Sequence, residues 1–176
     1  SIVDQYKHQW HVVDAVAELR NKGYPLFLDL VGPSYPPALH HLQETLYNLD
    51  PSESWVKYHG AVPYSNLHEI YAAANLGIFA SSCENMPNIL IETMAAGLPI
   101  ACSNRGPMPE ALGDNGVYFD PEQPFDISKA LQELIHSPRL RTEKANLNYL
   151  KAQRYSWKKC ATNTFTFLGE VIDDYE

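Results

Sequence analysis

Two glutamates, Glu84 and Glu92, flank the part of the sequence whose residue types are best suited to binding chemistry. A short apolar run, 76–81, ends just before Glu84, and a helical pattern begins near Pro87 and Asn88. Proline is favoured in the first turn of a helix, and asparagine satisfies free amide groups there. The unpaired N–H groups and the dipole of such a helix start attract anions. The sequence therefore predicts an anion site between the two carboxylates.

The two carboxylates indicate a ligand that carries more than negative charge. Carboxylates do not bind phosphate, but they accept hydrogen bonds from sugar hydroxyl groups. Two of them beside an anion site suit a ligand with hydroxyl groups on both sides of its phosphates. Taken alone, the pair favours a plainer interpretation, in which Glu92 complements the helix dipole and Glu84 is solvated.

Strand-like and helix-like patterns alternate along the chain and would position these residues. The strand-like runs are 26–32, 54–59, 76–81, 99–103 and 116–119. Such alternation predicts a three-layer α/β/α Rossmann-like fold, with a parallel sheet of about six strands covered on both faces. Ligands bind beyond the carboxyl ends of such strands, so we expect Glu84 and Asn88 at that edge.

The length of the chain suits a single domain, 1–176, with a helical tail from about residue 138. The first helical pattern begins near His8, so the residues before it can supply at most the end of a first strand. We therefore expect the chain to be part of a longer protein.

Composition excludes several classes of function. A net charge of −8 argues against nucleic-acid binding, which needs a basic face. No apolar run approaches the roughly 20 residues of a membrane span. The three cysteines, Cys83, Cys102 and Cys160, are widely spaced, which argues against a zinc site or a disulfide framework and favours the cytoplasm. We predict no metal site.

The glutamates form a Glu-x7-Glu motif within the segment ASSCENMPNILIETMAAGLPIACSNRGPMPEAL. This segment resembles the signature of glycosyltransferase family 4, a group of retaining enzymes with the GT-B architecture. The resemblance extends to HGAVPYSNLHEIYAAANLGIFAS and YKHQWHVVDAVAELRNKGYPLFLDLVG, and so covers nearly the whole chain. It implies the C-terminal, nucleotide-sugar-binding half of such an enzyme, without its N-terminal acceptor-binding domain.

The resemblance also implies roles for particular residues. Glu84 would contact the hydroxyls of the donor sugar, and Glu92 those of the ribose. Lys7 would neutralise the leaving diphosphate, so that Lys7 and Glu84 are the catalytic residues, and Val62 would pack on the nucleobase. The loop and helix start that would hold the sugar and diphosphate consist of Asn85, Met86, Pro87, Asn88 and Ile89.

The implied reaction needs no metal and no cofactor: a UDP- or GDP-sugar donates its sugar to an acceptor hydroxyl, with retention. One departure is Ile2, where the family usually has an arginine five residues before the lysine. Arg105, on a loop at the same sheet edge, is a candidate substitute, although a surface arginine without a role is the plainer interpretation.

The missing half would supply the acceptor site and any peripheral membrane contact, so we expect the isolated chain to be inactive in transfer. Two alternatives stay open: a nucleotide-sugar epimerase of GT-B architecture, and a non-catalytic nucleotide-sugar-binding module. The presence of Lys7, Glu84 and Glu92 together argues against the second.

Overall fold

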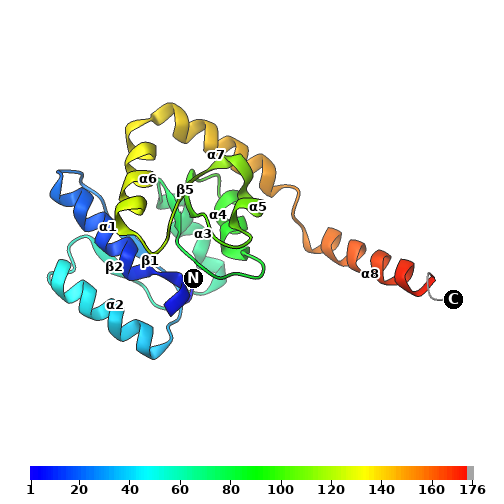
Figure 1. The fold of residues 1–176 in the computed structure, drawn as a ribbon, viewed down its shortest axis with the longest axis horizontal. Helices are drawn as coiled ribbons and strands as arrows, with labels where there is room; N and C mark the ends of the chain where they lie inside the picture. Colours follow the sequence, from blue (N-terminus) through cyan, green and yellow to red (C-terminus); the bar gives the residue numbers. More distant parts are fainter. Residues whose placement is uncertain (174–176) are drawn as a thin grey trace.

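Strands and helices alternate along the chain and form a body from which the last helix extends (Figure 1). The structure is a computed structural model, and it describes residues 1–173. The strands are β1 (Leu28–Leu30), β2 (Val56–Tyr58), β3 (Gly77–Phe79), β4 (Ile100–Ser103) and β5 (Gly116–Phe119). The α-helices are α1 (Gln9–Asn21), α2 (Pro36–Leu49), α3 (Tyr64–Ala73), α4 (Asn88–Ala95), α5 (Met108–Leu112), α6 (Pro124–His136), α7 (Pro138–Ala152) and α8 (Trp157–Asp173). Two 3-10 turns are η1 (Gln5–Lys7) and η2 (Gly113–Asn115).

All strand pairs are parallel, and they form two sheets within the described residues. One sheet joins β1 to β2, and the other has the order β3-β4-β5. The N-terminal segment adds a single parallel bridge from Val3 to Ser34. The parallel α/β fold class is thus confirmed, but the expectation of about six strands in one sheet is wrong. No pairing between described strands joins the β1-β2 sheet to the β3-β4-β5 sheet.

Helices cover both faces of the strands. Along β4, successive side chains belong in turn to two different hydrophobic clusters. Ala101 belongs to a hydrophobic cluster with α1, α2 and α6, whereas Ile100 and Cys102 belong to a second cluster with α4 and α5. Successive side chains of a strand point to opposite faces, so the two clusters are opposite layers of the core. All four residues of β4 are buried, as a strand covered on both faces requires.

A cavity of about 670 Å³ opens beside β1 and β3. Its walls include β1, β3, the inner side of α3 and the beginning of α4. Helix α3 buries none of its residues, because its apolar positions, such as Leu67 and Ile70, line this cavity. One end of the cavity reaches Lys7 and Glu92, which makes it the candidate ligand space.

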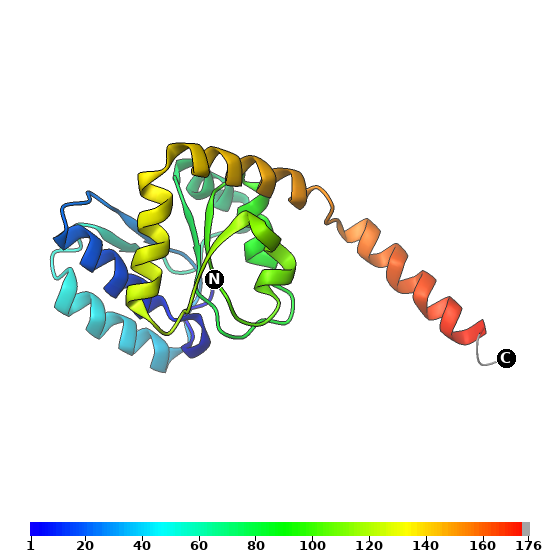
Figure 2. The same ribbon diagram turned by 45° about the horizontal axis from the view of Figure 1, so that its top comes forward.

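The predicted helical tail divides into two parts with different surroundings. Helix α7 packs on α4 and α6, and its Asn148 amide donates a hydrogen bond to the Leu98 carbonyl (2.9 Å). Helix α8 instead points away from the body in both ribbon views (Figures 1 and 2). Large apolar side chains on it are exposed: Trp157, Phe165, Phe167, Leu168 and Ile172. The helices of the tail thus begin at Pro138, and the chain leaves the body after Ala152.

Candidate functional site

The loop between β3 and α4 carries Glu84 to the carboxyl end of β3, as expected from the sequence. Pro87 is buried at the N-cap of α4, and Asn88 is the first helical residue. Gly77 allows α4 to lie close to β3, since a Cβ at that position would overlap the Cγ2 atom of Thr93. The strand and helix thus fix the two ends of the loop, and Glu84 lies between them.

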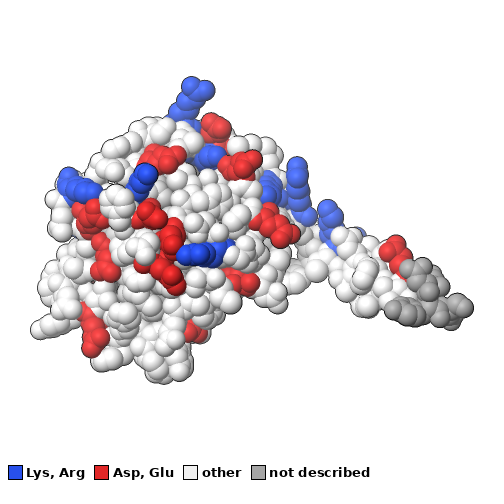
Figure 3. Space-filling model, in the orientation of Figure 1, with Lys and Arg blue, Asp and Glu red and all other residues white. Residues whose placement is uncertain are grey.

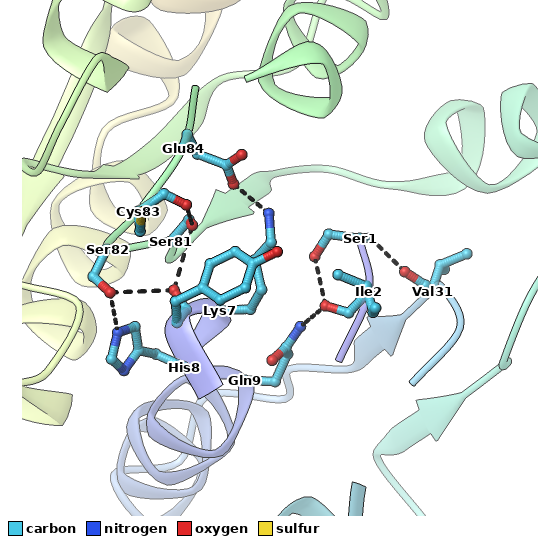
Figure 4. Close-up of polar contacts among 11 residues, drawn as sticks. Ser1, Ile2, Lys7, His8, Gln9, Val31, Ser81, Ser82, Cys83 and Glu84 are labelled. Carbon is cyan, nitrogen blue, oxygen red and sulfur yellow. Dashed lines mark hydrogen bonds and ion pairs between the residues drawn. The ribbon is translucent and has the colours of Figure 1, made fainter. Parts of the chain in front are cut away.

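Lys7 reaches the same place from the opposite end of the sequence. It ends the turn η1, which Asp4 caps by accepting a hydrogen bond from the Gln5 amide (2.7 Å). The Lys7 side chain is 8% exposed, and its ammonium group is ion-paired with Glu84 Oε1, whose side chain is 13% exposed. The ammonium also lies 5.5 Å from the centre of the Phe79 ring, within the range of a cation–π contact. Figure 4 shows this pair between η1 and the Glu84 loop.

Backbone contacts hold the Glu84 loop against η1 (Figure 4). The Ser82 amide donates to the Tyr6 carbonyl (2.8 Å). The Ser81 hydroxyl lies within hydrogen-bond distance of the carbonyls of both Tyr6 (3.3 Å) and Cys83 (3.0 Å). The relative position of Lys7 and Glu84 therefore does not depend on their ion pair alone.

The start of α4 offers amide groups to a ligand. The Asn88 amide is used locally, since it donates to the Met86 carbonyl (2.8 Å). The amides of Asn85, Met86 and Ile89 donate no hydrogen bond to any residue between 1 and 173. Free amides at a helix start, next to a lysine, are the elements of an anion site.

Other predicted site residues lie around the same cavity. Glu92, Val62 and Ile89 line it together with Lys7, and all three are partly exposed. Val62 comes from the loop between β2 and α3, and Glu92 from α4, so they approach from different elements. Asn85, Met86 and Asn88 are exposed beside them.

Arg105 is engaged elsewhere. Its guanidinium donates to Asp120 (2.8 Å) on the loop after β5, and its side chain is 47% exposed. Hydrogen bonds from the Glu122 amide and from Arg105 itself lower the pKa of Asp120, although burial opposes them. Ile2, at the position of the missing arginine, is partly buried and lines the cavity. The proposed substitution of Arg105 for that arginine therefore has no contact that favours it.

The structure adds a residue to the site that sequence reasoning missed. His8 is buried directly after Lys7, and its Nε2 atom lies 2.8 Å from the Ser82 hydroxyl. Burial first, and the neighbouring His11 second, lower the pKa of His8, so that it is neutral at pH 7. Its position beside Lys7 was visible in the sequence, but its partner lies 74 residues away and no local pattern predicts it.

Within residues 1–173, His, Cys, Asp and Glu side chains form no group of three that could hold a metal ion. None of the helices in that range is long and apolar enough to span a membrane.

Comparison with known proteins connects this geometry to one family. The sequence profile of the family described as glycosyl transferases group 1 matches residues 3–150. The O-antigen chain mannosyltransferase B of Escherichia coli is 32% identical over 112 residues, which are 64% of this chain and 29% of that protein. A D-inositol 3-phosphate glycosyltransferase of Streptomyces bingchenggensis is 25% identical over 82% of this chain and 31% of its own length.

Solved structures share the fold. HepE from Anabaena, crystallised with UDP and glucose, superposes with a TM-score of 0.84 at 20% identity, over 97% of this chain and 47% of that one. The C-terminal domain of the glycosyl transferase group 1 protein LpcC from Francisella tularensis gives 0.75 at 20% identity, over 87% of this chain and 81% of that one. This chain spans less than half the length of HepE and about a third of the curated relatives. With a parallel α/β fold of the GT-B type and a profile match over most of its length, the chain belongs to the glycosyl transferases of group 1.

Proposed function

We propose that this chain is the donor-binding, C-terminal half of a retaining glycosyltransferase of family 4, and that its cavity binds a nucleoside-diphosphate sugar. One observation carries the proposal: the buried Lys7 ammonium is paired with Glu84 at the loop that leads into the free amides of α4. A cation and a helix start suit a diphosphate, and a carboxylate suits sugar hydroxyls. The UDP bound by the related HepE supports this class of donor.

The ion pair of Lys7 and Glu84 adjusts when the donor binds. A lysine ammonium has three donors, so Lys7 can keep Glu84 and take a phosphate oxygen at the same time. When the bond between the anomeric carbon and the phosphate oxygen breaks, negative charge develops on the diphosphate. Lys7 and the amides of α4 stabilise that charge without reorganising, which lowers the barrier. Glu92 contacts the ribose of the bound donor, and Val62 packs on its base.

The rest of the activity belongs to a second domain. We propose that an N-terminal domain of the same polypeptide supplies the acceptor hydroxyl, and any contact with a membrane surface. The exposed apolar side chains of α8, such as Trp157 and Phe165, suit packing against that domain. Transfer would keep the anomeric configuration and need no metal. A cytoplasmic location fits the free thiols of Cys83, Cys102 and Cys160.

Titration of the chain with UDP, GDP and ADP in excess EDTA tests the proposal. At least one of the three should bind, because neither Lys7 nor the helix start needs a metal to attract a diphosphate. Failure of all three to bind would remove the basis of the donor site. Incubating the full-length enzyme with the matching nucleotide sugar and an acceptor then separates transfer from epimerisation by the identity of the product.

A further inference from the structure

His8 connects the two segments that carry Lys7 and Glu84, and the proposed function gives it no role. It stands between η1 and α1 with φ 50° and ψ 32°, in the left-handed region. A residue with a Cβ rarely adopts this conformation, and it persists where surrounding contacts enforce it. His8 is 7% exposed, so those contacts are with the protein.

The enforcing contact is with Ser82. His8 Nε2 lies 2.8 Å from Ser82 Oγ, and the Ser82 amide donates to the Tyr6 carbonyl (2.8 Å). With the bond from the Ser82 hydroxyl to the same carbonyl (3.4 Å), three hydrogen bonds join residues 6–8 to residue 82. His8 directly follows Lys7, and Ser82 lies two residues before Glu84, so this junction joins the segments that carry the ammonium and the carboxylate (Figure 4).

The surroundings of His8 select one protonation state. Its Nδ1 atom is buried without a hydrogen-bond partner in the described part of the chain. A proton on Nδ1 would therefore be a buried donor without an acceptor, which is costly. The proton belongs on Nε2, from where it is donated to Ser82 Oγ, and the Ser82 hydroxyl can donate on to the Tyr6 carbonyl (3.4 Å).

The charged and titratable groups around the imidazole come from several elements. His11 of α1 is stacked on it, with ring centres 5.4 Å apart and an angle of 12°. Lys7 precedes it in η1. Asp120 and Glu122, on the loop after β5, raise its pKa, but burial and His11 lower it by more. Protonation below its ordinary pKa of 6.5 therefore competes with the buried, neutral arrangement.

We propose that His8 is a positioning residue of the donor site, which acts through Ser82 to hold Lys7 beside Glu84. This inference rests on the proposed donor function of that pair. Neither His8 nor Ser82 needs to touch the ligand.

Calorimetry with UDP tests this role with two single variants, their double variant and a control. His8→Gly keeps the left-handed backbone at no steric cost but removes the imidazole. Ser82→Ala removes only the hydroxyl. At pH 8 each single variant should bind UDP about three- to tenfold more weakly than the wild type, the value of one hydrogen bond. The double variant should bind UDP no more weakly than the single variant with the larger loss of affinity. His40→Ala, at an exposed histidine on α2, should bind as the wild type does.

The pH profile separates positioning from a general loss of structure. The affinity ratio of wild type to His8→Gly should fall towards one as the pH drops well below 6.5. The second proton goes on Nδ1, which is buried without an acceptor, so the imidazolium should leave its buried position beside Ser82. Protonation of the diphosphate itself affects both proteins alike. Wild-type affinity in His8→Gly at pH 8, or losses that multiply in the double variant, would overturn the proposal.

Amide hydrogen exchange at Ser82 gives a test that needs no ligand. The Ser82 amide should exchange faster in His8→Gly than in the wild type. Without the contact between His8 and the Ser82 hydroxyl, its hydrogen bond to the Tyr6 carbonyl is held less firmly. Unchanged exchange would overturn the junction of His8 and Ser82 even if UDP binds. If the wild type binds no nucleoside diphosphate but the Ser82 amide exchanges faster in His8→Gly, the proposed donor function is wrong, while the contact between His8 and Ser82 is supported.

Discussion

Lys7 and Glu84 form a largely buried ion pair, and the proposed function gives each of them a second contact. The Lys7 ammonium would share its charge with a phosphate, and Glu84 would also accept a hydrogen bond from a sugar hydroxyl. A buried charge that loses its partner is strongly destabilising, so the pair also protects each residue when the site holds no donor. In the proposed function the donor therefore adds contacts to both residues without breaking their ion pair.

Replacing Glu84 with glutamine should therefore distinguish the free nucleotide from the nucleotide sugar. In Glu84→Gln the charge of Lys7 is fully available, so UDP should bind at least as tightly as to the wild type. UDP-glucose, used as a probe, should lose roughly tenfold relative to UDP, the value of one hydrogen bond to a charged group. Calorimetry with both ligands measures the two effects.

Glu92→Gln is the matched comparison for this experiment. It should weaken UDP and UDP-glucose to the same degree, because both contain the ribose that we assign to Glu92. A loss of free UDP binding in Glu84→Gln as large as that in Glu92→Gln would show that Glu84 does not serve the sugar.

At this scale the sequence points to candidate residues but not to the contacts between them. The spacing of Glu84 and Glu92 around a helix start is a local pattern, and the resemblance to family 4 gives them their proposed roles. The direct pairing of Lys7 with Glu84 spans 77 residues, and that of His8 with Ser82 spans 74. Such contacts depend on how far η1 and the loop after β3 reach across the sheet edge, and no local pattern contains that distance.

Among the elements, β3 and α4 hold the site through a close approach at Gly77. Gly77→Ala should cost roughly 1–3 kcal/mol of stability, because the new methyl overlaps Thr93 and shifts α4. The additional change Thr93→Ser removes the overlapping Cγ2 atom and keeps the hydroxyl that bonds Ile89, so it should restore most of the loss. Chemical denaturation measures both.

Gly169→Ala serves as the control for the glycine substitution. Nothing lies within 4 Å of a Cβ at Gly169 in α8, so alanine should be neutral or stabilising there. If Gly77→Ala were as stable as Gly169→Ala, the close packing of β3 and α4 would not be what positions the loop.

Asp50 fixes the connection between α2 and β2. Its carboxylate accepts hydrogen bonds from the amides of Ser54 (2.8 Å), Trp55 (2.9 Å) and Val56 (2.8 Å) and from the Ser54 hydroxyl (2.8 Å). Burial alone would raise the pKa of Asp50, but these bonds together lower it to about 2. The ionised carboxylate is thus part of the fold.

Asp50→Ala should destabilise the protein by about 2–4 kcal/mol at pH 7, because it leaves buried amides unpaired. In the wild type the contribution of ionisation, about 2 kcal/mol, is complete above the ordinary pKa of 3.8 and is lost as the pH falls to about 2. Denaturation at several pH values should show this loss in the wild type and not in Asp50→Ala. Parallel curves for the two proteins between pH 4 and pH 2 would contradict it.

The helices were predictable because their apolar residues recur at helical spacing, as in α1, where Trp10, Val13 and Val16 are buried. The strands were predictable as short apolar runs between turns. The division of the strands into two sheets was not, because hydrogen-bonded partners such as Leu28 and Val56 come from distant parts of the chain. Periodicity shows which side of a helix or strand is apolar, but it does not show which other element that side packs against or pairs with.

On the scale of the whole molecule, the charged face and the apolar surface of α8 suit two different kinds of partner. The face drawn in Figure 3 mixes acidic and basic side chains without a continuous basic patch, which agrees with the net charge of −8 and with a small-molecule ligand. The exposed apolar side chains of α8 suit a protein surface instead. We assign that surface to the acceptor domain.

The chain by itself should therefore bind a donor and transfer nothing. In the proposed function its residues contact only the donor, and the acceptor hydroxyl is bound by the other domain. A product assay with a nucleotide sugar and candidate acceptors should detect no transfer from the isolated chain and should detect it from the full-length protein. Robust transfer by the isolated chain would contradict the division into two halves.

The most direct test of the donor site is the effect of Lys7→Ala on binding of whichever of UDP, GDP and ADP the wild type prefers. A charge-assisted hydrogen bond contributes roughly 1.5–3 kcal/mol, so calorimetry should show affinity about ten- to a hundredfold weaker. Lys22→Ala, at an exposed lysine paired with Glu18 on α1, should bind as the wild type does. Equal affinity of Lys7→Ala and Lys22→Ala for that nucleotide would contradict the assignment of the diphosphate to Lys7 and the start of α4.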